Sequence, residues 1–421
     1  MITGLAFAGL LLIGAPIGIV LALSAYAFIM ASNNQVLLAS FPLQLFTGVD
    51  SYGLLAIPLF LLLGELMNGG GITRRLIGLA RAFIGTVRGG LAYINILANA
   101  LMASILGSAA AQIAIMSRVM VPEMDREGYD RRFSVATTAA AGLLAPIIPP
   151  SMMFVVYAVL ARVPAGDMFV AGIIPGLMMA GGFVLVVFVI GLFRPFPTPR
   201  AMNARERLTA IGAGLLTLVI PVVIIGSISA GIASPTESAG IACLAAYALG
   251  RFVTRELHDR QLPGMLANGG RNAAVVLFMV ATAAVFGWVL TFGKVPQAIA
   301  EWIQLVATGP VSFMLLVNLL LLVIGTVIDG IPGLIMVVPI LLPIATDIYG
   351  IDPVHFGVVV SINLVLGLVS PPVGIALFIA AAVTKMKPGD IFLWTVPYCL
   401  TTALVLVLLS IFPPLTLYLV R

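Results

Sequence analysis

The sequence predicts an all-α polytopic membrane protein with two inverted-topology repeats, each containing a re-entrant helical hairpin and a helix broken at a Pro-Pro pair. The first observation is composition, because 61% of the 421 residues are hydrophobic and only 9% are charged, against about a quarter charged in soluble domains. The second is a series of apolar runs long enough to cross the hydrocarbon core of a bilayer. The third is an internal sequence repeat.

Composition also excludes several classes of protein. Cys243 and Cys399 stand alone in apolar stretches, so neither a disulfide framework nor a zinc site can form, and both are expected to be packing residues. His258 and His355 lie far apart in polar connecting segments, which argues against a haem or metal-dependent enzyme. Because the basic residues lie in short loops between spans, the net charge of +5 indicates orientation in a bilayer and no nucleic-acid partner.

The repeat is recognised by matched prolines, glycines and aspartates at an offset of about 222 residues. Apolar composition alone does not produce such agreement. Internal duplication is typical of secondary transporters, whose halves run parallel or inverted. The matched residues are Pro149-Pro150 with Pro371-Pro372, Phe133 with Phe356, Gly166 with Gly389, Asp167 with Asp390, Phe169 with Phe392 and Pro175 with Pro397.

Lysine and arginine placement decides between parallel and inverted halves, because short cytoplasmic loops are enriched in these residues. Two segments of the first half are basic where their counterparts are not, and the next connection shows the opposite bias. The halves are therefore predicted to be inverted. The residues compared are Arg74, Arg75, Arg81 and Arg88 against Lys294, then Arg118, Arg126, Arg131 and Arg132 against none, then Arg162 against Lys385 and Lys387.

This orientation divides the chain into four parts. Residues 1–52 form an N-terminal scaffold segment, within which 31–52 receive no specific placement. Residues 53–193 form the first repeat, 194–271 a linker and a scaffold helical hairpin, and 272–421 the second repeat. The expected spans are 53–73, 168–193, 237–250 and 356–383 running inward, and 133–160, 208–230, 272–293 and 391–420 running outward. With these spans, only three of the 21 basic residues lie on the outer face of the membrane: Arg162, Lys294 and Arg421.

Residues 89–117 and 311–345 must then enter and leave the membrane on the same face, so both are predicted to be re-entrant hairpins. Each has a small or polar interruption at mid-length, GSAAAQ from Gly107 and GTVIDGIPG from Gly325. Non-helical backbone at such depth is tolerated only where it is buried in protein or lines a cavity. The two interruptions are therefore candidate functional tips.

Each Pro-Pro pair predicts a helix break, because two amide donors are lost and the proline rings clash with the preceding turn. Unpaired carbonyls beside a hydroxyl are good ligands for a small hard cation. Pairing each hairpin tip with the broken helix of its own half gives two pockets near the midplane, one neutral around Ser108 and one containing Asp329.

Half-helix ends that face each other would bind cations at their C-termini and an anionic substrate at their N-termini, between the two pockets. A single kink of this kind is more often a packing device, but four in repeated pairs favour a functional cavity. The predicted substrate-binding residues are Ser104, Gln112, Ser151, Asn363 and Gly374.

Other polar residues are expected to be structural. The run from Ser234 to Glu237 has the pattern of a capping box with proline at the first helical position, with a cavity role as the alternative. Asp167 and Asp390 are predicted N-caps, and residues 123–132 a solvated loop. Glu65 either pairs with an arginine of the following cytoplasmic segment or lines a pathway.

Several longer motifs, in their order along the chain, resemble a known family over essentially the whole length. They are GSAAAQIAIMSRVMVPEMDREGYDRRFS, APIIPPSMMFVVYAV, GIASPTESAGI and PILLPIATDIYGIDPVHFGVVVSINLVLGLVSPPVGIALF. The chain resembles the large membrane subunit, of the DctM type, of tripartite ATP-independent periplasmic (TRAP) transporters. The resemblance implies the elevator-like architecture of the ion-transporter superfamily, sodium-driven uptake of a small organic anion, and a multi-pass location in the bacterial inner membrane.

The resemblance also implies two partners besides the lipid bilayer, a small four-helix membrane subunit and a periplasmic solute-binding protein that delivers the substrate. Two or more transported sodium ions are expected, and no organic cofactor. The first tip departs from the family pattern, because Leu106 and Ala109 replace hydroxyl residues and leave that site to backbone carbonyls, Ser104 and Gln112. The implied sodium ligands are Ser108, Ala145, Ile148 and Pro150 at one site, and Gly325, Thr326, Asp329, Gly367, Ser370 and Pro371 at the other.

Other interpretations remain open at this point. A stand-alone organic-anion carrier of the same superfamily would share the inverted repeats and hairpins but would need no binding protein. A non-transporting membrane scaffold would show no change of flux on substitution of Asp329 or Ser370. An intramembrane enzyme is disfavoured, because no pair of titratable residues has a spacing suited to general acid and base roles.

Overall fold

The computed structural model describes residues 2–32, 34–198, 202–371 and 374–421, and within these ranges every regular element is a helix. Seven helical segments are long and apolar enough to cross a membrane. The prediction of an all-α polytopic membrane protein is therefore confirmed.

The helices alternate between long spans and pairs of shorter helices. Up to the end of the first predicted repeat they are α1 (Ile2–Leu12), α2 (Ile17–Ser32), α3 (Gln35–Val49), η1 (Tyr52–Leu55), α4 (Ala56–Gly69), α5 (Ile72–Ile84), α6 (Gly90–Leu106), α7 (Ala109–Arg126), α8 (Arg131–Gly142), α9 (Met152–Ala161) and α10 (Ala165–Phe193). The rest are α11 (Ala204–Ser229), α12 (Pro235–Ala248), η2 (Leu249–Val253), η3 (Asp259–Gln261), α13 (Leu262–Phe292), α14 (Val295–Val306), α15 (Pro310–Val327), α16 (Gly330–Pro343), η4 (Ile344–Ile348), α17 (Pro353–Gly367), α18 (Ile375–Thr384), α19 (Pro388–Ile411) and α20 (Pro414–Leu417).

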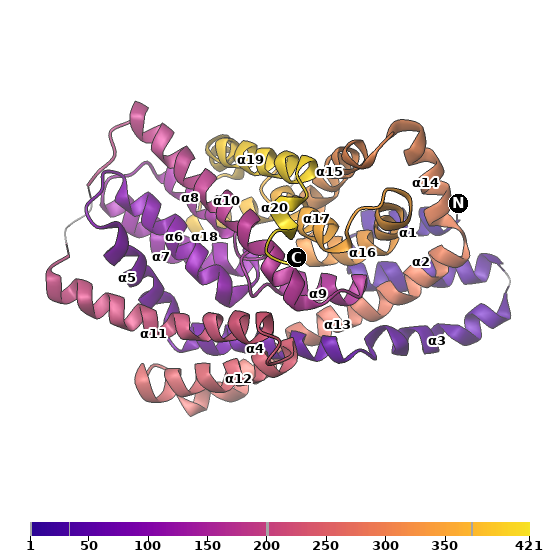
Figure 1. Cartoon of the computed structure of the whole chain (residues 1–421), viewed down its shortest axis with the longest axis horizontal. Helices are drawn as coiled ribbons and strands as arrows, with labels where there is room; N and C mark the ends of the chain where they lie inside the picture. Colours follow the sequence, from indigo (N-terminus) through magenta and orange to yellow (C-terminus); the bar gives the residue numbers. More distant parts are fainter. Residues whose placement is uncertain (1, 33, 199–201, 372–373) are drawn as a thin grey trace.

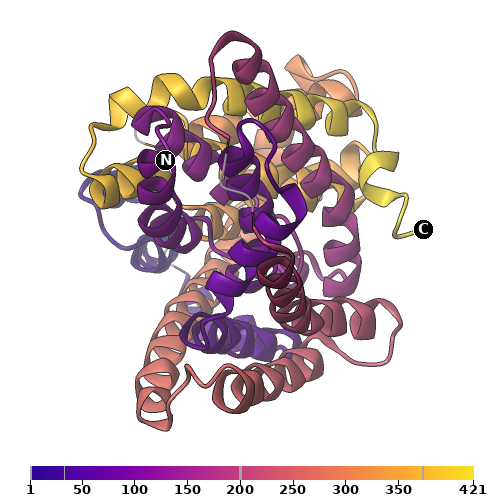
Figure 2. The same cartoon turned by 90° about the vertical axis from the view of Figure 1, so that its left-hand side faces the viewer.

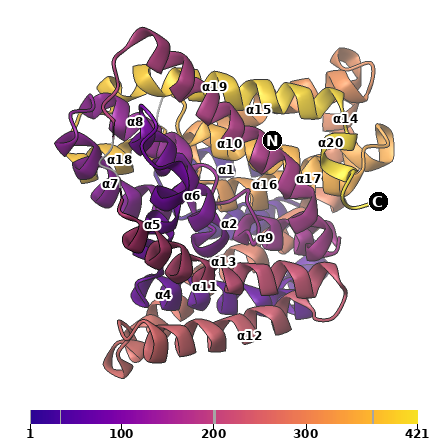
Figure 3. The same cartoon turned by 60° about the vertical axis from the view of Figure 1, so that its left-hand side comes forward.

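Helix α13 is the centre of a scaffold layer against which α2, α3 and α4 pack. Small residues allow the close approach, because a Cβ atom on Gly48 would lie 2.5 Å from the Cβ of Ala284, and one on Gly18 would lie 2.8 Å from the ring of Phe278. Helices α11 and α12 extend this layer by packing on α5 and α4, along the lower side of Figures 1, 2 and 3. The hairpins and broken helices lie above it.

The two ends of the molecule gather different parts of the chain. At one end, Arg131 donates to the carbonyl of Thr384 (2.9 Å), and the guanidinium of Arg194 lies 4.6 Å from the ring centre of Trp394. At the other end, Arg421 pairs with Asp352. The first end thus joins the start of α8 to the end of α18 and the end of α10 to α19, and the second joins the start of α17 to Arg421. These contacts agree with the orientation expected from the basic residues, although the inverted relation of the halves stays a prediction.

Both predicted hairpins are helix-turn-helix units, with longer arms than expected. Helices α6 and α7 meet at residues 107–108, but α7 continues past the expected end at 117. Helices α15 and α16 meet at residues 328–329, and a π-helical turn extends the second arm to Ile348. The broken helices are α8 with α9, and α17 with α18. Pro372 of the second Pro-Pro pair lies outside the described residues.

The predicted N-caps Asp167 and Asp390 are wrong. The caps are Pro164 and Lys387, so the helices begin earlier and both aspartates lie in the first turn. A negative charge in the first turn still interacts favourably with the positive end of the helix dipole. The predicted capping box is confirmed, because Ser234 Oγ accepts from the amide of Glu237 (3.2 Å) and the Glu237 carboxylate accepts from the amide of Ser234 (2.8 Å).

Two further expectations are corrected by helix extension. His355 does not lie in a polar connection but is buried in α17, where its Nδ1 is hydrogen-bonded to Thr416 (2.8 Å). The predicted loop at residues 123–132 is confirmed only for 127–130, because α7 continues to Arg126 and α8 begins at Arg131. Asp130 caps α8 by accepting from the amide of Arg132 (2.8 Å). Glu65 is half-buried and forms no ion pair within the described ranges.

Candidate functional site

Each hairpin tip is a sharp helix break followed by a capped helix. At the first tip, Gly107 adopts a left-handed conformation (φ +58°) that favours glycine, and Ser108 is the N-cap of α7. At the second tip, Asp329 is the N-cap of α16, and its Oδ1 accepts from the amide of Gly330 (2.8 Å). Polar residues preferred at N-caps therefore explain why the chain re-enters a helix at both positions.

The second tip is joined to its own broken helix by backbone contact. A Cβ atom on Gly367 would lie 2.3 Å from the carbonyl carbon of Gly325 and 2.7 Å from its oxygen, so only glycine fits. Across the break, the amide of Gly374 donates to the carbonyl of Thr326 (3.1 Å). The structure thus brings four of the predicted residues together, and the close approach explains why glycines occupy both sides of the junction.

The break in the first half leaves backbone oxygens without helical partners. In the loop at residues 143–151, no described amide donates to the carbonyls of Ala145, Ile148 or Pro150. The Ser151 hydroxyl caps α9 by accepting from the amide of Phe154 (3.3 Å) and donates to a loop carbonyl. Unpaired carbonyls in a mostly buried loop match the chemistry predicted for cation ligands, since a hard cation prefers oxygen donors.

The two tips converge on the start of α9. A Cβ atom on Gly107 would lie 3.2 Å from the amide nitrogen of Met152, whereas one on Gly330 would lie 3.4 Å from the sulfur of Met153. Two tips that come from opposite ends of the chain therefore touch consecutive residues. This places the space between them beside the N-terminus of α9.

The hairpins are shared between the halves, which the sequence did not indicate. The first arms, α6 and α15, pack against the broken helix of their own half, namely α8 and α17. The second arms also cross over, because α16 packs on α9 and α7 packs on α18. The expectation that each tip pairs only with its own half is therefore incomplete, because each hairpin also contacts the broken helix of the other half. We call the region where both tips meet the start of α9 the central site.

Buried asparagines fix each first arm to its broken helix, and of these only Asn363 was predicted from the sequence as a site residue. In the first half, Asn95 donates to Thr138 Oγ1 (2.7 Å). In the second, Asn363 donates to the side-chain oxygen of Asn318 (2.9 Å), and Asn318 donates to Ser410 (2.8 Å). An amide side chain within an apolar run was the sequence feature that indicates such a pair. Polar groups at membrane depth are costly unless they are hydrogen-bonded, so each of these amides needs a partner.

Two predicted substrate ligands belong to these networks. The Gln112 amide donates to the side-chain oxygen of Asn99 (2.9 Å), and the side-chain nitrogen of Asn99 donates to the side-chain oxygen of Asn95 (2.8 Å). The carbonyl oxygens of the Gln112 and Asn363 side chains are buried without a described partner. The donor groups of both side chains thus hold helices together, and a role toward substrate stays a prediction.

The remaining predicted residues differ in exposure. Ser104 is buried and donates to the carbonyl of Leu101 (2.7 Å), and Ser370 donates to the carbonyl of Leu366 (3.0 Å). Asp329 and Pro371 are exposed, whereas Ser108 is half-buried. Asp329 forms no ion pair among the described residues, so its carboxylate is available to a cation.

Two broken helices that meet two hairpin tips inside a bundle of membrane spans define a membrane transport protein. Residues 5–415 match the family model described as tripartite ATP-independent periplasmic transporter, DctM component. The chain belongs to this family, and it is a large permease component of the bacterial inner membrane rather than an enzyme.

Similar proteins support the assignment. The chain is 35% identical over 378 residues to the C4-dicarboxylate TRAP transporter large permease protein DctM of Pseudomonas aeruginosa, which covers 90% of this chain and 88% of that protein. It is 34% identical to the sialic acid TRAP transporter large permease protein SiaM of Vibrio cholerae, over 98% of this chain and 96% of that protein. The solved YdaH transporter of Alcanivorax borkumensis shares the fold, with a TM-score of 0.67 at 16% identity over 90% of this chain and 88% of that one.

Proposed function

We propose that this permease imports a small organic anion together with sodium ions, by an elevator-type movement of the hairpin-containing part against the α13 scaffold. The observation that carries the proposal is the second tip. There the backbones of Gly325 and Gly367 are in contact, and Asp329, four residues further along the chain, forms no ion pair among the described residues. Such a junction offers oxygen ligands only, which suit a hard cation and not a soft transition metal.

The helix N-termini around the two tips and breaks favour the binding of an anionic substrate. Four helices begin around the two tips and breaks, and the N-terminus of a helix carries a partial positive charge with free amide donors. They are α7, α9, α16 and α18. A carboxylate between the tips would face these ends while sodium ions neutralise the fixed negative charge. Relatives named for C4-dicarboxylate and sialic acid transport support an organic acid as the substrate class.

The family assignment supports two protein partners. A tripartite transporter has a periplasmic solute-binding protein and a small membrane subunit besides the large permease, and we propose that this chain works with both. The scaffold helices α11 and α12 carry exposed apolar side chains, among them Val222 (65% exposed) and Leu244 (72% exposed). In the membrane these side chains face lipid or the small subunit.

Thermal unfolding in detergent tests the cation. Sodium that binds only the folded protein raises stability by RT ln(1 + [L]/Kd), about 2.7 kcal/mol at a hundred times Kd. We expect a saturable rise in Tm with sodium but not with potassium or choline, and a much smaller rise in Asp329→Asn. The matched control is Asp347→Asn, because Asp347 is also exposed and hydrogen-bonded locally, to Thr346 (2.8 Å). A sodium response equal in both variants would remove Asp329 from the site.

Reconstituted uptake separates the tripartite mechanism from the stand-alone alternative. Proteoliposomes that contain the permease and its membrane subunit are given a sodium gradient, labelled organic acid, and the binding protein or buffer. Uptake only with the binding protein supports the tripartite proposal. Uptake at the same rate without it would favour a stand-alone carrier, and no sodium dependence in either case would contradict sodium coupling.

A further inference from the structure

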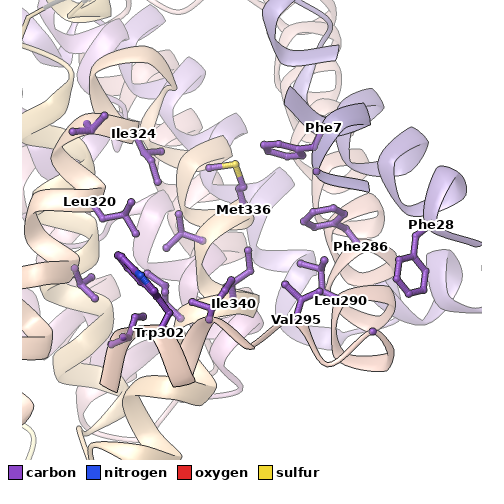
Figure 4. A pocket seen from close by; sticks show the side chains of 18 of the residues that line it. Phe7, Phe28, Phe286, Leu290, Val295, Trp302, Leu320, Ile324, Met336 and Ile340 are labelled. Carbon is purple, nitrogen blue, oxygen red and sulfur yellow. The ribbon is translucent and has the colours of Figure 1, made fainter. Parts of the chain in front are cut away.

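A large apolar cavity lies between the scaffold and the second hairpin. Its volume is about 1150 Å³, larger than the roughly 300–1,000 Å³ of common ligand pockets. One wall comes from α1, α2 and α13, and the other from α15 and α16, with α14 across one end. Figure 4 shows Phe7, Phe286, Trp302, Leu320 and Met336 among the side chains around the space.

The lining excludes water as the occupant. Apart from the Ser32 hydroxyl and the indole of Trp302, the side chains around the cavity are hydrocarbon, aromatic or thioether. A buried water needs two to four polar partners, so a polar filling of this space would be unstable. The cavity also opens to the bilayer, because its lining residues Leu319 and Val323 are 64% and 63% exposed on the surface of a membrane helix.

The rim has the features of a lipid headgroup region. Helix α14 buries Pro296, Ala300 and Ile303, and it exposes polar side chains together with apolar ones, as helices at membrane interfaces do. The exposed residues include Gln297, Glu301 and Gln304, beside Leu305 and Val306. Trp302 is 61% exposed, and tryptophan is enriched at the membrane–water boundary. Lys294, an exposed residue between two that line the cavity, adds a positive charge.

We propose that this cavity is a phospholipid site, with an acyl chain between the two walls and an anionic phosphate at Lys294. The acyl chain buries hydrocarbon against hydrocarbon, and the phosphate meets the ammonium group of Lys294. The cavity reaches Ile324, the neighbour of Gly325 at the second tip. Under the proposed function the lipid would therefore separate the moving hairpin from the scaffold, but lipid binding itself does not depend on transport.

Tryptophan fluorescence tests the site, because the chain has only three tryptophans. Substitutions Trp288→Phe and Trp394→Phe leave Trp302 as the reporter in the cavity. A matched protein with Trp288→Phe and Trp302→Phe keeps Trp394, which stacks with Arg194 at the other end of the molecule. Both full-length proteins, with any membrane subunit that co-purifies, are titrated in detergent with phosphatidylglycerol brominated on its acyl chains.

We expect saturable quenching of Trp302 and not of Trp394, displaced by unbrominated phosphatidylglycerol. Leu320→Phe with Ile340→Phe narrows the cavity and should weaken binding about tenfold, the equivalent of about two methylene groups that lose burial. Leu393→Phe with Leu400→Phe, on an exposed face of α19, is the control and should leave binding unchanged.

Lys294→Glu keeps the cavity intact and should also weaken binding, so the proposal stays testable if the narrowed variant does not fold. Equal, non-saturating quenching of both tryptophans would mean ordinary annular lipid and overturn the proposal, as would no quenching at all. Loss of the signal when the small membrane subunit is bound would make the cavity a subunit interface instead. None of these outcomes bears on sodium binding at Asp329.

Discussion

Substitution of Gly367 by alanine tests the junction between the second tip and the broken helix. The added Cβ would lie 2.3, 2.5 and 2.7 Å from three backbone atoms of Gly325, and ordinary contact begins at 3.4 Å. No side chain can rotate away, so one backbone segment must move by about 1 Å, and overpacking of this kind costs about 3 kcal/mol. For a chain of this size the expected loss in Tm is roughly 3 °C.

The matched control is Gly181→Ala in α10, where nothing lies within 4 Å of the new atom. In a helix interior that change should stabilise the protein by up to about 1 kcal/mol through helix propensity. Thermal unfolding in detergent and sodium-driven uptake in proteoliposomes are measured for both variants. If Gly367→Ala were as stable and as active as Gly181→Ala, the backbone contact would not exist as described.

Three further experiments test the local contacts around the site and scaffold. Asn318→Leu removes the side-chain hydrogen bonds of Asn318 with Asn363 and Ser410, while the Asn363 amide keeps the backbone carbonyl of residue 318 as an acceptor. The loss in unfolding free energy, measured by thermal unfolding, should be about 0.5–1.5 kcal/mol for each bond removed. A double-mutant cycle of Asn95→Ala and Thr138→Ala should give a coupling energy above about 0.5 kcal/mol, because the two side chains share a hydrogen bond; additive losses would contradict it. Ser234→Ala removes the α12 cap and should cost about 1 kcal/mol by the same assay, whereas Ser234→Asp should restore most of it.

The helix breaks could be predicted because their causes are local. A Pro-Pro pair cannot continue a helix in any tertiary context, and glycine with a capping residue at mid-length signals a turn. The breaks after Gly142 and around Gly107 and Asp329 therefore follow from short stretches of sequence. The predicted ends of the hairpins were less accurate, since α7 continues through a charged segment to Arg126. That segment looked like a loop from charge alone.

The partners of the helices could not be predicted, because packing across the molecule leaves no periodic signal. Gln112 and Asn363 were assigned to substrate for being polar in an apolar run, yet their amides donate to Asn99 and Asn318. The sequence indicates that a buried amide needs a hydrogen-bond partner. It does not distinguish a partner on a neighbouring helix from a partner on a ligand, because either one satisfies the amide. The crossing of α7 to α18 and of α16 to α9 is hidden for the same reason.

Charge at the central site connects this geometry to the order of events in transport. Asp329 is the only ionisable side chain in either tip or in the two breaks. A carboxylate substrate at roughly 6 Å from it would be repelled by about 3 kcal/mol at an effective dielectric constant of about 20. One sodium ion at Asp329 cancels that repulsion, and a second at the carbonyls of the first break makes the site attractive. Under the proposed function, cation binding must therefore precede anion binding, and the single carboxylate is what makes uptake of the acid depend on sodium.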